Sequence, residues 1–499
     1  MCPHEAEKAV VGETTRLLDS VPGDEELAER DWSSSAKRTS AWKEELSALI
    51  ELSVPVIGTY LLEMFPGITS IILVGHIHHE QTEEFIDATA LAVMFRNCVA
   101  ISVGVGLTSA LDTLCSQAYG ANETHRMGTY LQTGVLVLSA FTVLVAVLFY
   151  FCEEILIALG QPEEVAKMTG TFSRILLPGI PALYLYELLR KVLQAQNVAN
   201  PMLIVSIAAN VVNVVLGYFL VFHTAWGWLG AAVARTASDM TFFLLLLPYT
   251  VGSGLSTTFW TGIHWKEAVE GITQFLTLGI PGMLQVCFEW WAFEVLALIC
   301  GLLPNAVVSI GANAVVLNIA SMAFMPYYGL SVGCNVRVGN ALGASDPERA
   351  KLAAYLSLGL AAATAVVCAT LLLTFRKSIP RWLTHDEEIN QLSAELLIVV
   401  AVFQLPDAIN GTVQGIFRGS GRQALGAQLN FVAYYLLGLP FAFLLAFWLH
   451  QGVAGLWEGM TVGLLLVAVV GTILVKRSDW VLLAKQATER IEEEGLQKD

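Results

Sequence analysis

Charged side chains are scarce in this chain of 499 residues. Asp, Glu, Lys and Arg together make up 14% of the sequence, whereas hydrophobic residues make up 55%. A soluble globular protein typically carries about 25% charged residues. The composition, with a mean hydropathy of +0.62, therefore excludes an ordinary soluble protein and indicates an integral membrane protein.

Patterns that bind metal or nucleic acid are also missing. The eight cysteines are scattered without the paired spacing of a metal site, so we interpret them as small packing residues. The segment HIHH at 76–79 contains three histidines and is followed by several glutamates. We interpret it as a solvated loop. The net charge of −16 says little about a partner, because acidic residues lie largely in tails and loops, and we do not expect the protein to bind nucleic acid.

Long apolar runs fill most of the sequence. We count twelve runs that approach or exceed the length of about 20 residues that a helix needs to cross a bilayer. They lie near 47–74, 88–111, 129–151, 171–193, 202–222, 228–249, 272–300, 306–330, 352–374, 392–416, 425–448 and 453–475. No cleavable signal peptide is expected, because residues 1–45 are polar and mixed in charge.

The distribution of basic residues predicts the orientation in the membrane. With the N-terminus in the cytosol, 20 of the 27 Lys and Arg residues fall in cytosolic segments, so both termini are predicted to be cytosolic. The boundaries that we predict are a disordered cytosolic tail at 1–45, an N-lobe at 46–249, an inter-lobe loop at 250–271, a C-lobe at 272–476 and a cytosolic tail at 477–499.

The sequence repeats itself once. A shift of 226 residues aligns 52–75 with 278–301, a shift of 223 aligns 116–126 with 339–349, and a shift of 225 aligns 227–232 with 452–457. Three matches in order indicate a duplicated six-helix unit, and such halves have parallel topology. We therefore predict an all-α polytopic membrane protein whose twelve transmembrane helices form two parallel six-helix lobes. Pseudo-twofold symmetry along the membrane normal relates the lobes, and this architecture is typical of secondary transporters.

Four short segments stand out, namely LDTLCSQAYGA (111–121), VRVGNALGA (336–344), FRGSG (417–421) and GVAGLWEG (452–459). They resemble the eukaryotic branch of the multidrug and toxic compound extrusion (MATE) family, and the resemblance covers residues 46–476. It implies an antiporter that exports organic cations or other small amphipathic compounds in exchange for protons or sodium. Eukaryotic members carry EWW-x-x-E in the seventh helix and an acid in the tenth, so the resemblance places the cation site at Glu289, Glu294 and Asp407.

Carboxyl groups inside predicted spans are costly on physical grounds as well. A charge in a span costs about 2.5 kcal/mol or more, so such a group is expected to face protein or water. Glu289 and Glu294 are separated by about 140° of helix turn, which lets both border a wide cavity. Pro406 bends the tenth span beside Asp407 and can open space there. The structural alternatives are a neutral glutamic acid in a helix interface and a kink packed against its neighbour.

Two neighbours of Glu289 are predicted to line the substrate site. Gln285 lies one turn before Glu289, and Trp290 offers an aromatic face to an organic cation, a contact worth about 2 kcal/mol when desolvated. Packing or anchoring at the membrane interface is the alternative for such aromatic residues.

Glu63 and Arg96 are unexpected charges in the first two spans. Glu63 is the repeat equivalent of Glu289, which suggests a proton or substrate site in the N-lobe. Arg96 lies about as deep, some 24 Å from its cytosolic helix end, so we favour a structural Glu63–Arg96 ion pair. Arg235 and Asp239, four residues apart, are predicted to pair within one helix.

Other functions are weighed against the antiporter. A membrane-embedded enzyme is disfavoured because no Asp-rich or His-rich cluster stands at a span end. A flippase for lipid-linked precursors of related architecture would favour a cationic cavity, whereas the predicted one is acidic. We expect no cofactor and a monomer in the bilayer. Three carboxylates without a neutral-oxygen cage favour protons over sodium as the coupling ion.

The N-terminal tail contains a candidate sorting signal. ETTRLL at 13–18 has the form of an acidic dileucine signal, which predicts a vacuolar or lysosomal membrane. The plasma membrane is the alternative.

Overall fold

The computed structural model describes residues 24–496, including the side chains of residues 41–492. This part of the chain is built from helices joined by turns and loops, and no strand occurs in it. Eleven of its helical spans are long and apolar enough to cross a membrane. They are α2 (Asp24–Gly75), the continuous α3 (Thr82–Arg96), η1 (Asn97–Ile101) and α4 (Ser102–Gly120), α5 (Arg126–Tyr150), α9 (Asn200–His223), α10 (Leu229–Gly252), α12 (Ile272–Cys300), α13 (Ala306–Gly343), α14 (Pro347–Phe375), α15 (Glu387–Gly419), the continuous α16 (Gln423–Phe431), η4 (Val432–Gly438), α17 (Leu439–Phe443) and η5 (Leu444–Trp448), and α18 (Gly452–Lys476).

The predicted fourth run, 171–193, is helical but broken. It is formed by α7 (Glu163–Leu176) and α8 (Gly179–Ala195), which are separated at Leu177 and Pro178. Proline lacks the N–H that would continue the hydrogen-bond ladder, so the chain is interrupted there. All twelve predicted runs are therefore helical, and the predicted fold class is confirmed.

The segments outside the two lobes contain more helix than the sequence predicted. Helix α2 begins at Asp24, inside the tail that we expected to be disordered, while residues 1–23 lie outside the described part. The C-terminal tail forms α19 (Trp480–Leu496). The remaining short helices are α6 (Cys152–Ala158), η2 (Leu255–Thr258), α11 (Trp265–Glu270) and η3 (Pro380–Trp382).

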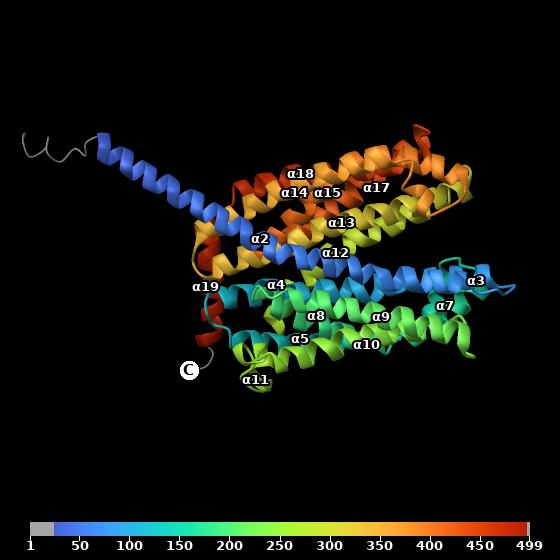
Figure 1. Cartoon of the computed structure of the whole chain (residues 1–499), viewed down its shortest axis with the longest axis horizontal. Helices are drawn as coiled ribbons and strands as arrows, with labels where there is room; N and C mark the ends of the chain where they lie inside the picture. Colours follow the sequence, from blue (N-terminus) through green and yellow to red (C-terminus); the bar gives the residue numbers. More distant parts are fainter. Residues whose placement is uncertain (1–23, 497–499) are drawn as a thin grey trace, which may run out of the picture. The chain divides into compact units, whose positions relative to one another are not determined.

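The two lobes are distinct bundles of long helices. Figure 1 shows α3 to α10, coloured blue to green, beside α12 to α18, coloured yellow to red. Large apolar side chains point outward from both bundles, for example Val143 on α5, Ile204 on α9 and Val367 on α14, which are 66%, 65% and 59% exposed. Since the chain spans a membrane, we assign these faces to the lipid.

The lobes meet along a seam formed by α4 on one side and by α12, α13 and α15 on the other. Gln117 Nε2 donates to the Gly419 carbonyl at 3.0 Å, and Gln423 Nε2 donates to Thr113 Oγ1 at 2.6 Å. At Gly120 an added Cβ would collide with the backbone of Asn340. Three of the four segments that carry the family resemblance (111–121, 336–344 and 417–421) thus build the inter-lobe seam.

Helix α19 spans the predicted cytosolic end of this seam. Its apolar residues Trp480, Leu483 and Ala487 are buried in a cluster with residues of the C-lobe. Its polar face reaches the N-lobe, where Arg490 Nη1 donates to Gln117 Oε1 at 2.5 Å and Arg126 donates to the Ile491 carbonyl. One C-terminal helix therefore contacts both lobes (Figure 1).

Candidate functional site

A cavity of about 430 Å³ lies between the two lobes. Its walls come from α2, α3, α8 and α10 in the N-lobe and from α12, α13 and α15 in the C-lobe. Six carboxyl groups and three guanidinium groups line it. They are Glu63, Glu187, Asp239, Glu289, Glu294 and Asp407, together with Arg96, Arg190 and Arg235.

The C-lobe wall brings together the three acids that the family resemblance identified. Glu289 and Glu294 come from α12, and Asp407 comes from α15 beside Pro406. Asp407 is 4% exposed, and both glutamates are half-buried. Among the described residues, none of the three forms an ion pair with a basic side chain. This wall therefore presents carboxyl groups that form no ion pair in the described part of the chain, and Arg418 is a basic residue that borders the same hollow as Glu289.

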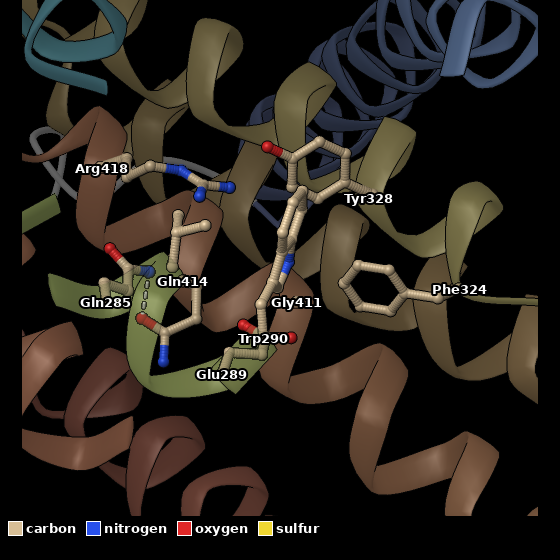
Figure 2. A pocket seen from close by; sticks show the side chains of 9 residues that line it. Gln285, Glu289, Trp290, Phe324, Tyr328, Gly411, Gln414 and Arg418 are labelled. Atoms are coloured by element: carbon tan, nitrogen blue, oxygen red, sulfur yellow. Dashed lines mark hydrogen bonds between the residues drawn. The ribbon is translucent and has the colours of Figure 1, made fainter. Parts of the chain in front are cut away.

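Glu289 also borders a small hollow below the cavity. Figure 2 shows Gln285, Gln414 and Arg418 around it, with the Gln285 amide donating to Gln414 Oε1. The hollow holds about 10 Å³, which is about the space of one water molecule. Gln285 is buried here and does not line the large cavity, whereas Trp290 lines both spaces.

The Glu289 carboxyl is held by neutral polar groups. It makes hydrogen-bonding contacts with the side chains of Asn430 and Tyr434. Asn430 accepts from Gln414 Nε2 at 2.7 Å and donates to the Gln285 carbonyl at 3.0 Å. The amides thus fix the surroundings of Glu289 without neutralising its charge.

Aromatic rings line the cavity beyond Trp290. The sequence prediction missed five of them, namely Tyr60, Phe242, Phe324, Tyr328 and Phe403. The spacing of Phe324 and Tyr328, one turn apart around Pro326 in α13, could have indicated a shared face. A cavity walled by rings and carboxyl groups suits a flat, cationic, amphipathic molecule.

The N-lobe wall contradicts our prediction for Glu63. Its carboxylate accepts from Arg190 Nη1 at 2.8 and 2.9 Å and from the Tyr186 hydroxyl at 2.9 Å. Arg190 is fully buried and also donates to Glu187 at 2.6 and 2.5 Å. The predicted Glu63–Arg96 pair is wrong because equal depth does not bring two side chains onto facing helix surfaces. Arg190 stands near the end of the predicted run 171–193 and lies inside α8.

Arg96 instead pairs with Asp239. Arg96 Nη2 lies 2.7 Å from Asp239 Oδ2, and Arg235 Nε lies 3.4 Å from Asp239 Oδ1. The predicted contact between Arg235 and Asp239 is therefore present, but its carboxylate is shared with a second arginine. The three arginines of the cavity all belong to the N-lobe wall, and each has a carboxylate partner.

A further charged cluster, missed from the sequence, lies at the seam. Asp112 is 2.9 Å from Lys191 Nζ and 3.8 Å from Arg418 Nε. Asp112 and Lys191 come from the N-lobe, while Arg418 comes from the C-lobe and also borders the Glu289 hollow. The signal in the sequence was Asp112 itself, which stands inside the first segment of the family resemblance.

The HIHH segment lies at the turn between α2 and α3. His76 Nδ1 contacts the carbonyl of Ile72 at 2.8 Å, so its ring is bound to its own helix end. Within the described residues, no group of three or more His, Cys, Asp or Glu side chains is arranged to hold a metal ion.

The sequence model of the MatE family matches the chain twice, at residues 55–219 and 281–444. The two matches begin 226 residues apart, the same shift at which residues 52–75 align with 278–301. The predicted duplication of a six-helix unit is therefore confirmed.

Known proteins resemble the chain over most of its length. Multidrug and toxin extrusion protein 1 of Homo sapiens is 36% identical over 451 residues, covering 90% of this chain and 78% of that protein. Protein DETOXIFICATION 16 of Arabidopsis thaliana is 34% identical over 479 residues, covering 95% and 97%. The crystal structure of the eukaryotic MATE transporter AtDTX14 matches with a TM-score of 0.86 at 30% identity, covering 90% and 100%. The chain is therefore a multi-pass membrane protein and a transporter, not an enzyme, and it belongs to the MatE family of multidrug and toxin extrusion proteins.

Proposed function

We propose that this transporter exports organic cations or other small amphipathic compounds in exchange for protons. The observation that carries the proposal is the contrast across one cavity. Within the described residues its C-lobe wall presents Glu289, Glu294 and Asp407 without ion-pair partners, while the arginines of the N-lobe wall are already paired. A cation that enters the cavity finds carboxylates that no side-chain cation neutralises, with aromatic faces beside them.

Protons are the coupling ion that these groups support best. A carboxyl that must release a proton before it can balance a cation makes proton and substrate binding mutually exclusive, which is the requirement for exchange. Each pH unit of gradient supplies about 1.4 kcal/mol per proton, and each 100 mV supplies about 2.3 kcal/mol per charge. Sodium is the alternative ion, and it would require additional oxygen ligands around the same acids.

Alternating access accounts for the arrangement of the lobes. The seam that joins α4 to α12, α13 and α15 closes the predicted cytosolic side of the cavity. For substrate to enter from the cytosol, these contacts must separate and equivalent contacts must form at the other end of the bundle. The small residues of the seam allow close backbone approach, which favours a packed but separable interface.

The test is transport by purified protein in liposomes with imposed gradients. A pH gradient, acidic on the side opposite the substrate, is expected to drive uptake of a fluorescent organic cation, and a sodium gradient of equal size is not. Glu289→Gln is expected to abolish the uptake. If the sodium gradient alone drives uptake, the coupling ion is sodium; if a labelled lipid-linked sugar is translocated and the cation is not, the flippase replaces the exporter.

The cellular membrane and the oligomeric state are further parts of the proposal. We propose a monomer, because the cavity is built entirely from one chain. We propose a vacuolar or lysosomal membrane from the ETTRLL signal, which lies outside the described residues. Removal of residues 1–20 is expected to move a tagged protein to the plasma membrane, and an unchanged location contradicts the signal.

A further inference from the structure

The inter-lobe loop, residues 250–271, is fastened to the N-lobe. Gln132 on α5 holds it at two points, since its Nε2 donates to the Gly262 carbonyl at 2.9 Å and its Oε1 accepts from the His264 N–H at 2.8 Å. The ring of Phe259 is buried in the N-lobe core. These contacts satisfy irregular backbone that could not otherwise lie close to lipid, and they attach the loop to one lobe.

The contacts with α5 indicate how deep the loop lies. Thr133 Oγ1 donates to the Ala268 carbonyl at 3.0 Å, and Thr133 is about 10 Å along α5 from Arg126, where the helix begins. On α10, exposed apolar side chains continue to Val251. Figure 1 accordingly shows α11 beside the ends of α5 and α10. The polar zone of a bilayer is about 5–7 Å deep on each side of the hydrocarbon core, so the loop lies at interfacial depth.

Large apolar side chains project from this loop. Trp260, Ile263, Trp265 and Val269 are 43%, 76%, 56% and 50% exposed. Exposed apolar clusters mark contacts with proteins or membranes, and tryptophan is enriched where a membrane meets water. These four side chains form the apolar patch of the loop.

Helix α11 separates the apolar patch from charge. Ala268 is fully buried, and Trp265 and Val269, four residues apart, share one flank of the helix. Lys266 and Glu270, also four residues apart, lie 3.9 Å from each other and are 92% and 50% exposed. The helix can therefore turn one flank to lipid and the other to water, as interfacial helices do.

We propose that the inter-lobe loop anchors the N-lobe in the phospholipid interface at the predicted cytosolic face. The apolar patch enters the boundary between headgroups and acyl chains, while Lys266 and Glu270 stay in water. Phospholipid is favoured over a protein partner because the patch lies at interfacial depth. The chain also enters and leaves the loop through two membrane spans, α10 and α12. The inference is independent of the transported compound and of the coupling ion.

Quenching of a fluorophore from the lipid and from the water tests the anchor. Ile263→Cys and Lys266→Cys are made separately in the full-length chain. In this background Cys2, which lies outside the described residues, and the half-buried Cys98 and Cys368 are replaced by alanine. Each variant is labelled with a nitrobenzoxadiazole maleimide and placed in phosphatidylcholine nanodiscs, which leave both membrane faces open to solution. A nitroxide on the acyl chain near the headgroup is expected to quench the label at position 263 severalfold more than the label at position 266. Aqueous iodide is expected to show the reverse order.

A further variant tests whether the tryptophans hold the loop against lipid. Trp260→Asp and Trp265→Asp, combined with Ile263→Cys, are expected to lower nitroxide quenching severalfold and to raise iodide quenching. Both tryptophans are exposed, and Trp265→Asn alone serves if the double change does not fold.

Three results would overturn the anchor. The first is equal quenching of the two labels by nitroxide and by iodide. The second is protection of position 263 from iodide without quenching by nitroxide, which would mean that a protein surface, such as a second copy, covers the patch. The third is unchanged quenching after replacement of the tryptophans. Loss of transport in any variant bears on the proposed function and not on this result.

Discussion

The two walls of the cavity descend from the same repeated unit but differ in charge balance. In the N-lobe, three carboxyl groups face three arginines at ion-pair distances. In the C-lobe, three carboxyl groups line the cavity with no basic partner among the described residues. Equivalent positions in a duplicated chain can therefore carry the same residue and have different surroundings.

Glu63 and Glu289 show how the difference arises. They align at a shift of 226, and Pro181 of α8 aligns with Pro406 of α15 at a shift of 225. At that shift Arg190, which binds Glu63, falls on Gly415, while Glu187 falls on Thr412. Gly415 packs directly against the Ser331 backbone and offers no charge. The C-lobe glutamate contacts amide and hydroxyl groups instead, and Arg418 borders the same hollow without an ion pair to it.

The largest effect on stability is expected from replacing Arg190, which pairs with both Glu63 and Glu187. Arg190→Met leaves Glu63 and Glu187 without their cation at a position where Arg190 is fully buried. Removing one partner of a buried pair typically costs about 3–5 kcal/mol, so the unfolding temperature in detergent should fall strongly. Arg174→Met removes a partly exposed contact with Glu153 and should cost less than about 1 kcal/mol. Equal unfolding temperatures for the two variants would mean that the N-lobe charges do not support the fold.

The second prediction compares the same substitution at the two repeat-related glutamates, Glu63 and Glu289. Glu289→Gln should abolish pH-driven export with little change in unfolding temperature, because Glu289 has no ion pair to lose. Glu63→Gln should lower the unfolding temperature more and impair export less, because it weakens the Arg190 cluster. Both quantities are measured on the same preparations. Export at the normal rate by Glu289→Gln would show that the coupling acid lies elsewhere.

Much of this architecture was predictable because it follows from patterns along the chain. Apolar runs located the twelve helices, and internal alignment located the two lobes. The acids on α12 and α15 were found because carboxyl groups are rare in such runs and because their segments resemble a family. Periodicity and composition carry this information without reference to neighbouring helices.

Partners across helices were not predictable in the same way. Arg190 and Arg418 stand near or just beyond the ends of predicted apolar runs, where a charge can reach water, yet both are buried in long helices. Depth along a span can be calculated from the rise per residue, but the direction of a side chain around the helix depends on packing. The Glu63–Arg96 prediction failed at this step.

A third prediction concerns affinity on the C-lobe wall. Asp407→Asn should weaken binding of an organic cation about tenfold, because one of three unpaired carboxylates is lost, with a smaller change in unfolding temperature. The measurement is the Kd for a fluorescent organic cation, and the control is Asn318→Ala, which changes a neutral cavity-lining residue. A large loss of stability with unchanged affinity would assign Asp407 to packing beside Pro406.

The smallest effect is expected at the junction of the lobes, where α19 contacts both. Its apolar face stays with the C-lobe, while Arg490 holds Gln117 on α4. Arg490→Gln removes the charged hydrogen bond to Gln117, and the population should move toward a state in which the seam is open. A cysteine introduced at Ser116, which is fully buried against Gly339, reports this opening by its rate of reaction with a maleimide. The rate should rise severalfold in Arg490→Gln and stay constant in Lys485→Gln, whose exposed lysine pairs with Glu489 of the same helix. If both variants react at the wild-type rate, α19 does not hold the two lobes together, and the seam residues alone close the cavity.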